Sequence, residues 1–219
     1  MKITVIYDNN AKDGLKSGWG FSCLIESDKN ILFDCGDNEK SLLYNIKKLA
    51  IDLKTIDMII LSHEHWDHTG GLADILKSAE NVTVVLPKSF SDEMKVAISK
   101  HAKIIEITEC RELSEDVFSI GELNGHGQPN EQALALKTSK GVMVITGCAH
   151  PGISEILKEA EKHGKIYGIL GGFHDFSDFD VLEGIELLAP CHCTKHLKEI
   201  QDTYPENYRK INAGSVIEL

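Results

Sequence analysis

The sequence predicts an α/β fold formed by one domain. Short apolar segments of strand length alternate along the chain with segments whose apolar residues recur at helical spacing. No segment rich in proline or serine separates one part of the chain from another. The 219 residues can bury a substantial core, and chains usually divide into domains only beyond about 250 residues. We therefore expect a single domain over residues 1–219.

The expected strands are apolar segments of five to seven residues bounded by turn residues. They cover residues 2–7, 21–26, 30–36, 57–62, 81–87, 102–108, 134–138 and 141–146. Apolar runs that precede His174 and His192 predict two further strands.

The expected helices have apolar residues at i, i+3 and i+4 with charged residues between them. They cover residues 39–50, 70–80, 91–102, 152–164 and 179–189. The early part of the chain is rich in strands, and strands alternate with helices in the rest, which is typical of layered α/β proteins.

The composition argues against several classes of partner. The formal net charge is −11, and no window of the chain is dominated by Lys or Arg, so we expect no nucleic-acid partner. No apolar stretch approaches the roughly 18 residues of a membrane span, and the first residues do not form a signal peptide, so we expect no membrane partner and a cytoplasmic location. The six cysteines are then expected to be reduced thiols.

A weak internal repeat connects the two halves of the chain. Residues 59–86 and 142–170 each read as a strand, a loop with histidine, a helix and a second strand, and His68 aligns with His150. Two more histidines, His174 and His192, also follow apolar strands. Because ligands gather at the carboxyl ends of strands in α/β proteins, we expect these histidines to share one site.

Residues 63–68 read HEHWDH and follow the apolar run MIIL after one serine. In an extended chain, residues i and i+2 point to the same side, so His63 and His65 face one way. The helical metalloprotease motif HExxH needs a second histidine where this chain has Asp67. We therefore expect an extended loop in which Asp67 and His68 supply ligands from a second direction, which gives two metal positions.

Imidazole nitrogens and carboxylate oxygens form a donor set that suits Zn²⁺, and also Mn²⁺ or Fe²⁺. We expect Zn²⁺, one or two ions per chain, with Mn²⁺ or Fe²⁺ as alternatives. Asp34, at a predicted strand end, either holds a metal-binding histidine through its second ring nitrogen or forms the turn before Gly36.

HEHWDH resembles the HxHxDH signature of the metallo-β-lactamase superfamily. ILFDCG resembles the strand-Asp-Gly motif of that family. GWGFSCLIE, NEQALAL, VITGCAHPGI, GGFH and HCT resemble the branch named for a dihydropterin ribofuranosylaminobenzene phosphate synthase. The resemblance covers nearly the whole chain and implies a four-layer αββα sandwich with two similar halves and a metal site at one edge.

The resemblance also implies the ligands. His63 and His65 would bind one metal ion together with His150, and Asp67 and His68 would bind a second ion together with a late histidine.

The late histidines are assigned by their order in the chain. In related phosphodiesterase-like members, a histidine after the penultimate strand acts on the substrate and one after the last strand binds metal. By that resemblance His192 is the metal ligand and His174 is catalytic. Asp67 is also expected to be catalytic, because it would help to position the reacting water.

The chain departs from the family pattern at Cys148. Members usually have an Asp in a Gly-Asp pair where this chain has GCAH, so the bridging carboxylate is replaced. Cys148 either binds the second metal as a thiolate or packs as a small buried side chain.

Together, the motifs predict a metal-dependent hydrolase that uses a metal-activated water on a small anionic, phosphate-bearing substrate. Two alternatives stay open. One is an iron-dependent oxidoreductase on the same fold, and the other is a non-catalytic metal-containing protein that binds a ligand. The oligomeric state is not predicted.

Overall fold

The computed structural model describes residues 1–219 and contains two β-sheets. The first sheet consists, in spatial order, of β13 (Val216–Glu218), β1 (Lys2–Tyr7), β2 (Ser22–Glu26), β3 (Asn30–Phe33), β4 (Met58–Ile60), β5 (Thr83–Pro87) and β6 (Lys103–Ile107). The second consists of β12 (Leu187–Cys191), β11 (Ile166–Gly172), β10 (Gly141–Thr146), β9 (Glu131–Thr138), β8 (Val117–Leu123) and β7 (Arg111–Ser114). Strands β3 to β6 are parallel, as are β10 to β12.

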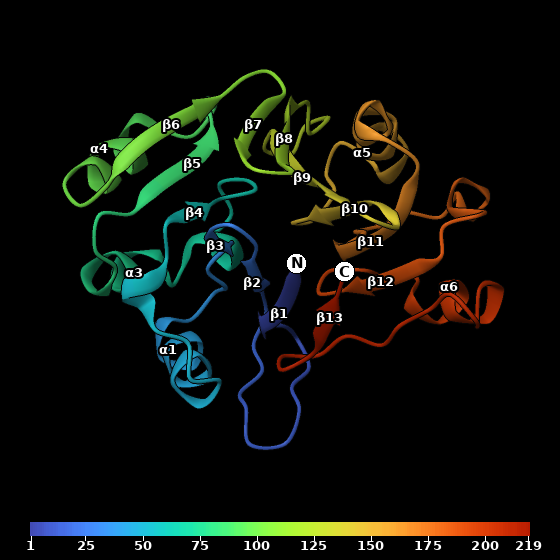
Figure 1. Ribbon diagram of the computed structural model, residues 1–219, viewed down its shortest axis with the longest axis horizontal. Helices are drawn as coiled ribbons and strands as arrows, with labels where there is room; N and C mark the ends of the chain where they lie inside the picture. The colour runs from blue at the N-terminus through green and yellow to red at the C-terminus, as the bar shows by residue number, and fades with distance from the viewer.

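Helices cover the outer face of each sheet (Figure 1). The first sheet is covered by α1 (Glu39–Lys48), α3 (Leu72–Ser78) and α4 (Asp92–Ser99), and the second by α5 (Ile153–Ala160) and α6 (Leu197–Thr203). This is the four-layer αββα sandwich that the sequence predicted, and that prediction is confirmed. None of the helices has the length and apolar character needed to cross a membrane.

Three apolar cores hold the four layers together. The inner faces of the two sheets meet in one core, to which β3 contributes Phe33 and β10 contributes Met143 and Ile145. A second core lies between the first sheet and its helices, and a third between the second sheet and its helices. Each fully buried Leu, Ile or Phe side chain stabilises the fold by about 1.5–3 kcal/mol.

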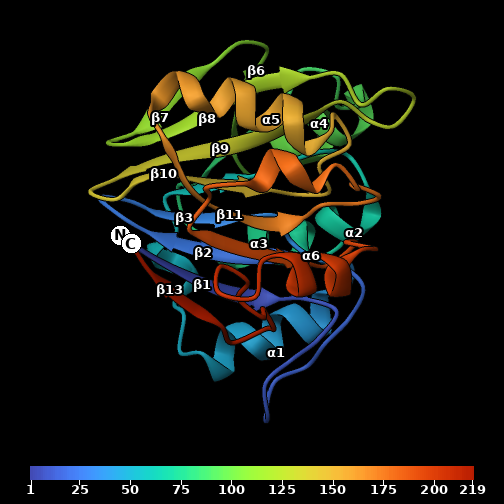
Figure 2. The ribbon, with the colours of Figure 1, turned by 90° about the vertical axis from the view of Figure 1, so that its right-hand side faces the viewer.

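The two repeat copies form equivalent βαβ units. In the first, β4 and β5 are parallel and α3 lies between them in the chain, and in the second, β10 and β11 are parallel and α5 lies between them. The histidine loops therefore follow the carboxyl ends of β4 and β10. In Figure 2 the two chain ends lie at the end of the sandwich opposite α2 (Trp66–Thr69), the short helix that follows β4.

The structure contradicts one predicted helix. Residues 179–189 form a 3₁₀ turn at Phe179–Leu182, a bend at Gly184 and then strand β12. Gly184 has a φ of 79°, a conformation that interrupts a helix, and the following residues pair in parallel with β11. Strands β7, β8 and β13 were not predicted either.

Candidate metal centre

The HEHWDH segment changes conformation at its middle. His63 and Glu64 lie in a bend and His65 is extended, with φ −106° and ψ 150°. Asp67 and His68 lie in the helical turn α2, so the expectation of an extended loop is wrong for these two residues. The turn forms because the His65 carbonyl accepts from the N–H of His68 and from the N–H and hydroxyl of Thr69. The His68 ring still lies close to that of His63, with centroids 4.2 Å apart.

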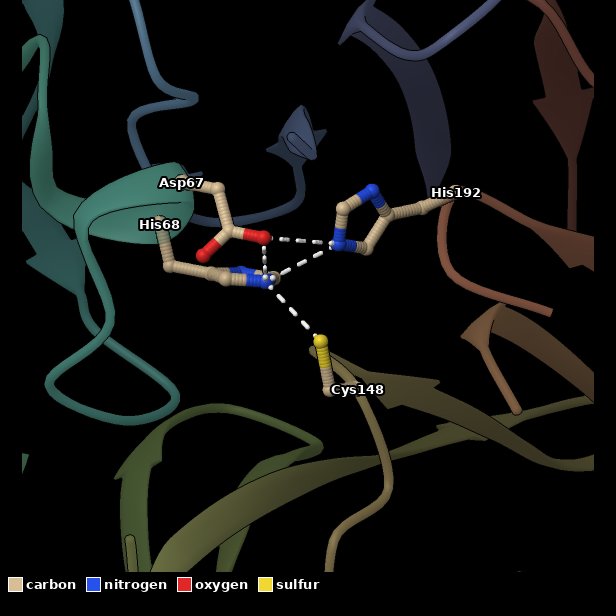
Figure 3. A group of neighbouring side chains, drawn as sticks. All are labelled: Asp67, His68, Cys148 and His192. Atoms are coloured by element: carbon tan, nitrogen blue, oxygen red, sulfur yellow. Dashed lines mark hydrogen bonds and ion pairs between the residues drawn. The ribbon is translucent and has the colours of Figure 1, made fainter. Parts of the chain in front are cut away.

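One group of possible metal ligands contains Asp67, His68, Cys148 and His192, and all four are buried. Their ligand atoms lie within 4.8 Å of one another (Figure 3). His68 Nε2 lies 3.1 Å from Cys148 Sγ and 3.2 Å from His192 Nε2. Asp67 Oδ2 lies 3.4 Å from His192 Nε2. The structure therefore brings residues from the loops after β4, β10 and β12 to one point.

A second group contains His63, Cys148 and His150, again with ligand atoms within 4.8 Å. His65 lies beside it, with Nδ1 3.1 Å from His63 Nε2. The six residues expected as metal ligands are therefore gathered in one place, and Cys148 belongs to both groups.

Asp34 orients one histidine of each group. Its carboxylate accepts from His68 Nδ1, from the Ser62 hydroxyl and from the Ser62 N–H, each at 2.7 Å. Because the Ser62 hydroxyl donates to Asp34, it accepts from His63 Nδ1, which lies 2.9 Å away. Both histidines then carry the Nδ1 proton, and their Nε2 lone pairs face the ligand groups. Asp34 thus holds a histidine through its second ring nitrogen, and its φ of 54° is in the left-handed region.

Replacing Asp34 with Asn is expected to weaken metal binding by about 10- to 100-fold. The amide keeps the shape and tolerates the positive φ, but it cannot accept all three hydrogen bonds, so His63 and His68 lose their orientation. Competition with a chromophoric chelator measures the change. Asp28→Asn, at an exposed position, is the matched control, and equal affinities of the two variants would contradict this role.

Glu131 fixes the loop that carries Cys148 and His150. The carboxylate is buried and accepts from the backbone N–H groups of residues 147, 148, 149 and 150, at 2.9 to 3.0 Å. Glu131 Oε2 also lies 3.0 Å from His150 Nδ1. This role of Glu131 was not predicted from the sequence. The only sequence signal is an acidic residue at the start of an apolar strand.

The N-terminal segment after β1 holds His192. Asp8 accepts from the His192 N–H at 2.9 Å, and Asn9 donates to the His192 carbonyl at 2.9 Å. Asn9 Oδ1 lies 3.1 Å from His192 Nδ1 and can accept from it, so that Nε2 faces the ligand group. The Trp19 ring meets the His192 ring edge to face, with centroids 5.4 Å apart. None of these contacts, made by three residues, was predicted.

The electrostatics of the site fit a divalent cation. Burial, together with the nearby His192, lowers the pKa of His68 to about 3, and burial also lowers the pKa values of His63 and His65. These three imidazoles are therefore neutral, which is the form that binds a divalent cation. His68 Nε2 and His192 Nε2 lie 3.2 Å apart, close enough to share one ion. The buried histidines thus fit the divalent metal ion that the sequence predicts.

Two carboxyl groups at the site behave differently. Burial raises the pKa of Asp34 to about 7. Burial also opposes ionisation of Asp67, but its hydrogen bond with His192 and the nearby His68 outweigh burial and lower the pKa of Asp67. Asp67 is therefore the ionised carboxylate of the ligand groups.

His174 lies next to the ligands but in neither group. Its ring is 5.3 Å from that of His150, and both line a pocket of about 230 Å³. Its φ of 46° turns the chain sharply after β11. Burial and the nearby His150 lower its pKa. The structure therefore separates His174 from His192, which lies among the ligands.

The fold and the site together define a class of two-sheet α/β proteins with a histidine-rich metal centre at the carboxyl ends of strands from both sheets. The chain belongs to the metallo-β-lactamase superfamily, whose family model matches residues 20–188. The fold of this family implies binding of divalent metal, and most of its members are metal-dependent hydrolases.

Several proteins resemble the whole chain. A 7,8-dihydropterin-6-methyl-4-(β-D-ribofuranosyl)-aminobenzene-5′-phosphate synthase from Methanocaldococcus jannaschii is 28% identical over 91% of this chain and 90% of its own. Tm1679, whose crystal structure is described as a metal-dependent hydrolase of the β-lactamase superfamily, is 27% identical, covers 100% of this chain and 99% of its own, and has a TM-score of 0.83. A diphosphatase from the PhnP family, at 14% identity and a TM-score of 0.70 over 100% of this chain and 96% of its own, shares the fold.

Proposed function

We propose that the protein is a metal-dependent hydrolase of a small, anionic, phosphate-bearing substrate. One observation carries the proposal: two groups of metal-ligand atoms meet at the carboxyl ends of strands from both sheets and share one residue. Such a pair of groups suits two closely spaced cations, which are used to hydrolyse phosphoesters.

The ligand assignment follows the two groups. His63, His65 and His150 would hold one ion, and Asp67, His68 and His192 would hold the other. Zn²⁺ is our first choice because imidazole, carboxylate and thiol donors all suit it, with Mn²⁺ and Fe²⁺ as alternatives.

The bound cations would supply an activated water and polarise a substrate oxygen. Ionised Asp67 would orient that water, since its Oδ2 lies 3.9 Å from His68 Nε2 and 3.4 Å from His192 Nε2. His174, at the pocket beside His150, would donate its ring N–H to the leaving oxygen or stabilise its negative charge.

The surroundings support a small organic phosphate. The pocket beside His150 has about 230 Å³, which suits a small molecule. Both tryptophans of the chain lie next to ligands and are exposed, Trp19 by 52% and Trp66 by 62%, so their rings offer flat apolar surfaces. The phosphate named in the Methanocaldococcus jannaschii relative agrees with an anionic substrate. The lack of a nucleic-acid or membrane partner and the cytoplasmic location stay predictions.

Metal content and phosphodiester hydrolysis test this function. The protein is purified without added metal, its metals are measured by elemental analysis, and bis(4-nitrophenyl) phosphate is offered to the metal-free and the reloaded protein. Two zinc or manganese ions per chain, with hydrolysis only after reloading, are expected. Metal-loaded protein that leaves phosphodiesters intact but cleaves carboxyl esters would contradict the substrate class.

Replacing His174 with Ala is expected to lower kcat by about 10²- to 10⁴-fold, the usual contribution of a group that assists proton transfer. The metal content should stay at the wild-type value, because His174 belongs to neither ligand group. His163→Ala, on the far 3₁₀ turn at Glu161–His163, is the matched control and should keep full activity. Loss of metal from His174→Ala would instead make His174 a ligand.

A second function is favoured by one observation, the Cys148 thiol within the ligand groups, where the family pattern leads one to expect a carboxylate. Thiolate donors also suit iron, so an iron-dependent oxidoreductase is the alternative. One iron per chain, together with oxygen consumption and no ester hydrolysis, would establish this alternative over the hydrolase.

A further inference from the structure

Cys148 is the one residue that both ligand groups contain. Its side chain is only 3% exposed, and Sγ lies 3.1 Å from His68 Nε2 (Figure 3). Sγ also lies within 4.8 Å of the ligand atoms of His63 and His150. The Cys148 thiol therefore lies between the two ligand groups and not on the outer side of either group.

No carboxylate is available to join the two positions. Asp34 is occupied by three hydrogen bonds from Ser62 and His68, and Glu131 by four backbone N–H groups. Asp67 belongs only to the group of His68 and His192. Two cations held close together repel each other, and an anionic ligand between them offsets this repulsion.

The backbone around Cys148 holds Sγ in this place. Glu131 accepts from the N–H of Cys148 itself and of both its neighbours. Ala149 has a φ of 59°, and a Cβ at Gly147 would lie 2.2 Å from the Ser62 hydroxyl, so the loop packs tightly against the loop after β4. The Cα and Cβ of Cys148 are therefore fixed, which keeps Sγ within reach of both ligand groups.

We propose that the Cys148 thiolate bridges the two metal ions and replaces the carboxylate bridge that the family pattern leads one to expect. Binding releases the thiol proton to solvent, and sulfur then uses one lone pair for each ion. This inference rests on the metal positions of the proposed function, but it does not depend on whether the loaded protein hydrolyses a phosphoester.

Cobalt titration of the metal-free protein tests the bridge without any substrate. Thiolate bound to Co²⁺ gives a charge-transfer band in the near ultraviolet. A bridging sulfur should make this band grow through the first and the second equivalent of Co²⁺. A band that stops growing after the first equivalent identifies a ligand to one ion only and overturns the proposal.

Two substitutions at Cys148 and one at the nearby Cys193 test whether the band comes from the Cys148 sulfur. Cys148→Ala should abolish the band and weaken binding of one ion by at least about 100-fold, since even indirect partners of a metal cost 10- to 100-fold. Cys148→Asp should also abolish the band but keep two ions, because its carboxylate can bridge them.

Cys193→Ala is the matched control. This thiol lies close by, with Sγ 3.8 Å from the Cys148 carbonyl, but belongs to neither group. The charge-transfer band of the Cys193→Ala protein should equal that of the wild type. A band that survives Cys148→Asp, or disappears in Cys193→Ala, overturns the proposal. Missing hydrolysis with an intact band would refute only the hydrolase.

Discussion

Replacing Glu131 with Ala is expected to lower the free energy of unfolding by about 4 kcal/mol or more. The substitution leaves four backbone N–H groups of residues 147–150 buried without an acceptor, and each unsatisfied group costs about 1–3 kcal/mol. Urea denaturation of the metal-free protein measures the change, so that lost metal binding does not contribute.

Glu131→Gln is the matched control for this prediction. The Gln side chain keeps one oxygen, which can still accept from residues 147, 148 and 149, and loses the acceptor for His150. We expect it to lose only about 1–3 kcal/mol, because one buried donor remains unpaired. If the Ala variant were no less stable than the Gln variant, Glu131 would not be what holds this loop.

Asp67→Asn is expected to lower kcat/KM by about 10³-fold, or about 4 kcal/mol of transition-state stabilisation. The amide has the same shape but no negative charge, so it would lose the attraction to a cation shared with His68 and His192. The proposed function makes Asp67 both a ligand and the group that orients water, and both roles need the carboxylate. Elemental analysis and phosphodiester kinetics measure the two effects.

The comparison with His174→Ala separates the two roles. Asp67→Asn should lose one metal ion as well as activity, whereas His174→Ala should lose activity alone. Asp74→Asn, at a half-buried position of α3 where Asp74 pairs with Lys77, serves as the control for a change of charge. An Asp67→Asn protein with full metal content and full activity would refute the assignment of Asp67.

The parts of the fold that depend on local pattern could be predicted from the sequence. The two βαβ units follow from apolar runs and amphipathic spacing, and the place of His63, His68, His150 and His192 follows from the rule that ligands gather at the carboxyl ends of strands. The family resemblance added the proposal that these residues hold two ions.

Contacts between distant segments could not be predicted in this way. Residues 179–189 have helical spacing, but Gly184 and pairing with β11 make their second half a strand. Glu131 contacts the site because β9 pairs with β10, and Asn9 contacts it because the residues after β1 lie against His192, which follows β12. Polar residues with such roles have no periodicity that marks them in the sequence.

The origin of the ligands in different layers has a mechanical consequence. Four of them follow β4 in the first sheet, while Cys148, His150 and His192 follow strands of the second. Ions bound there would tie the two sheets together at one rim, beside the hydrogen bond from the Gln132 N–H to the Ser62 carbonyl at 2.9 Å. Each bound cation, at a free concentration 100 times its dissociation constant, would add about 2.7 kcal/mol to the free energy of unfolding. Bound metal would then link the two sheets, which are otherwise held together mainly by apolar packing, and a chelator would remove this link.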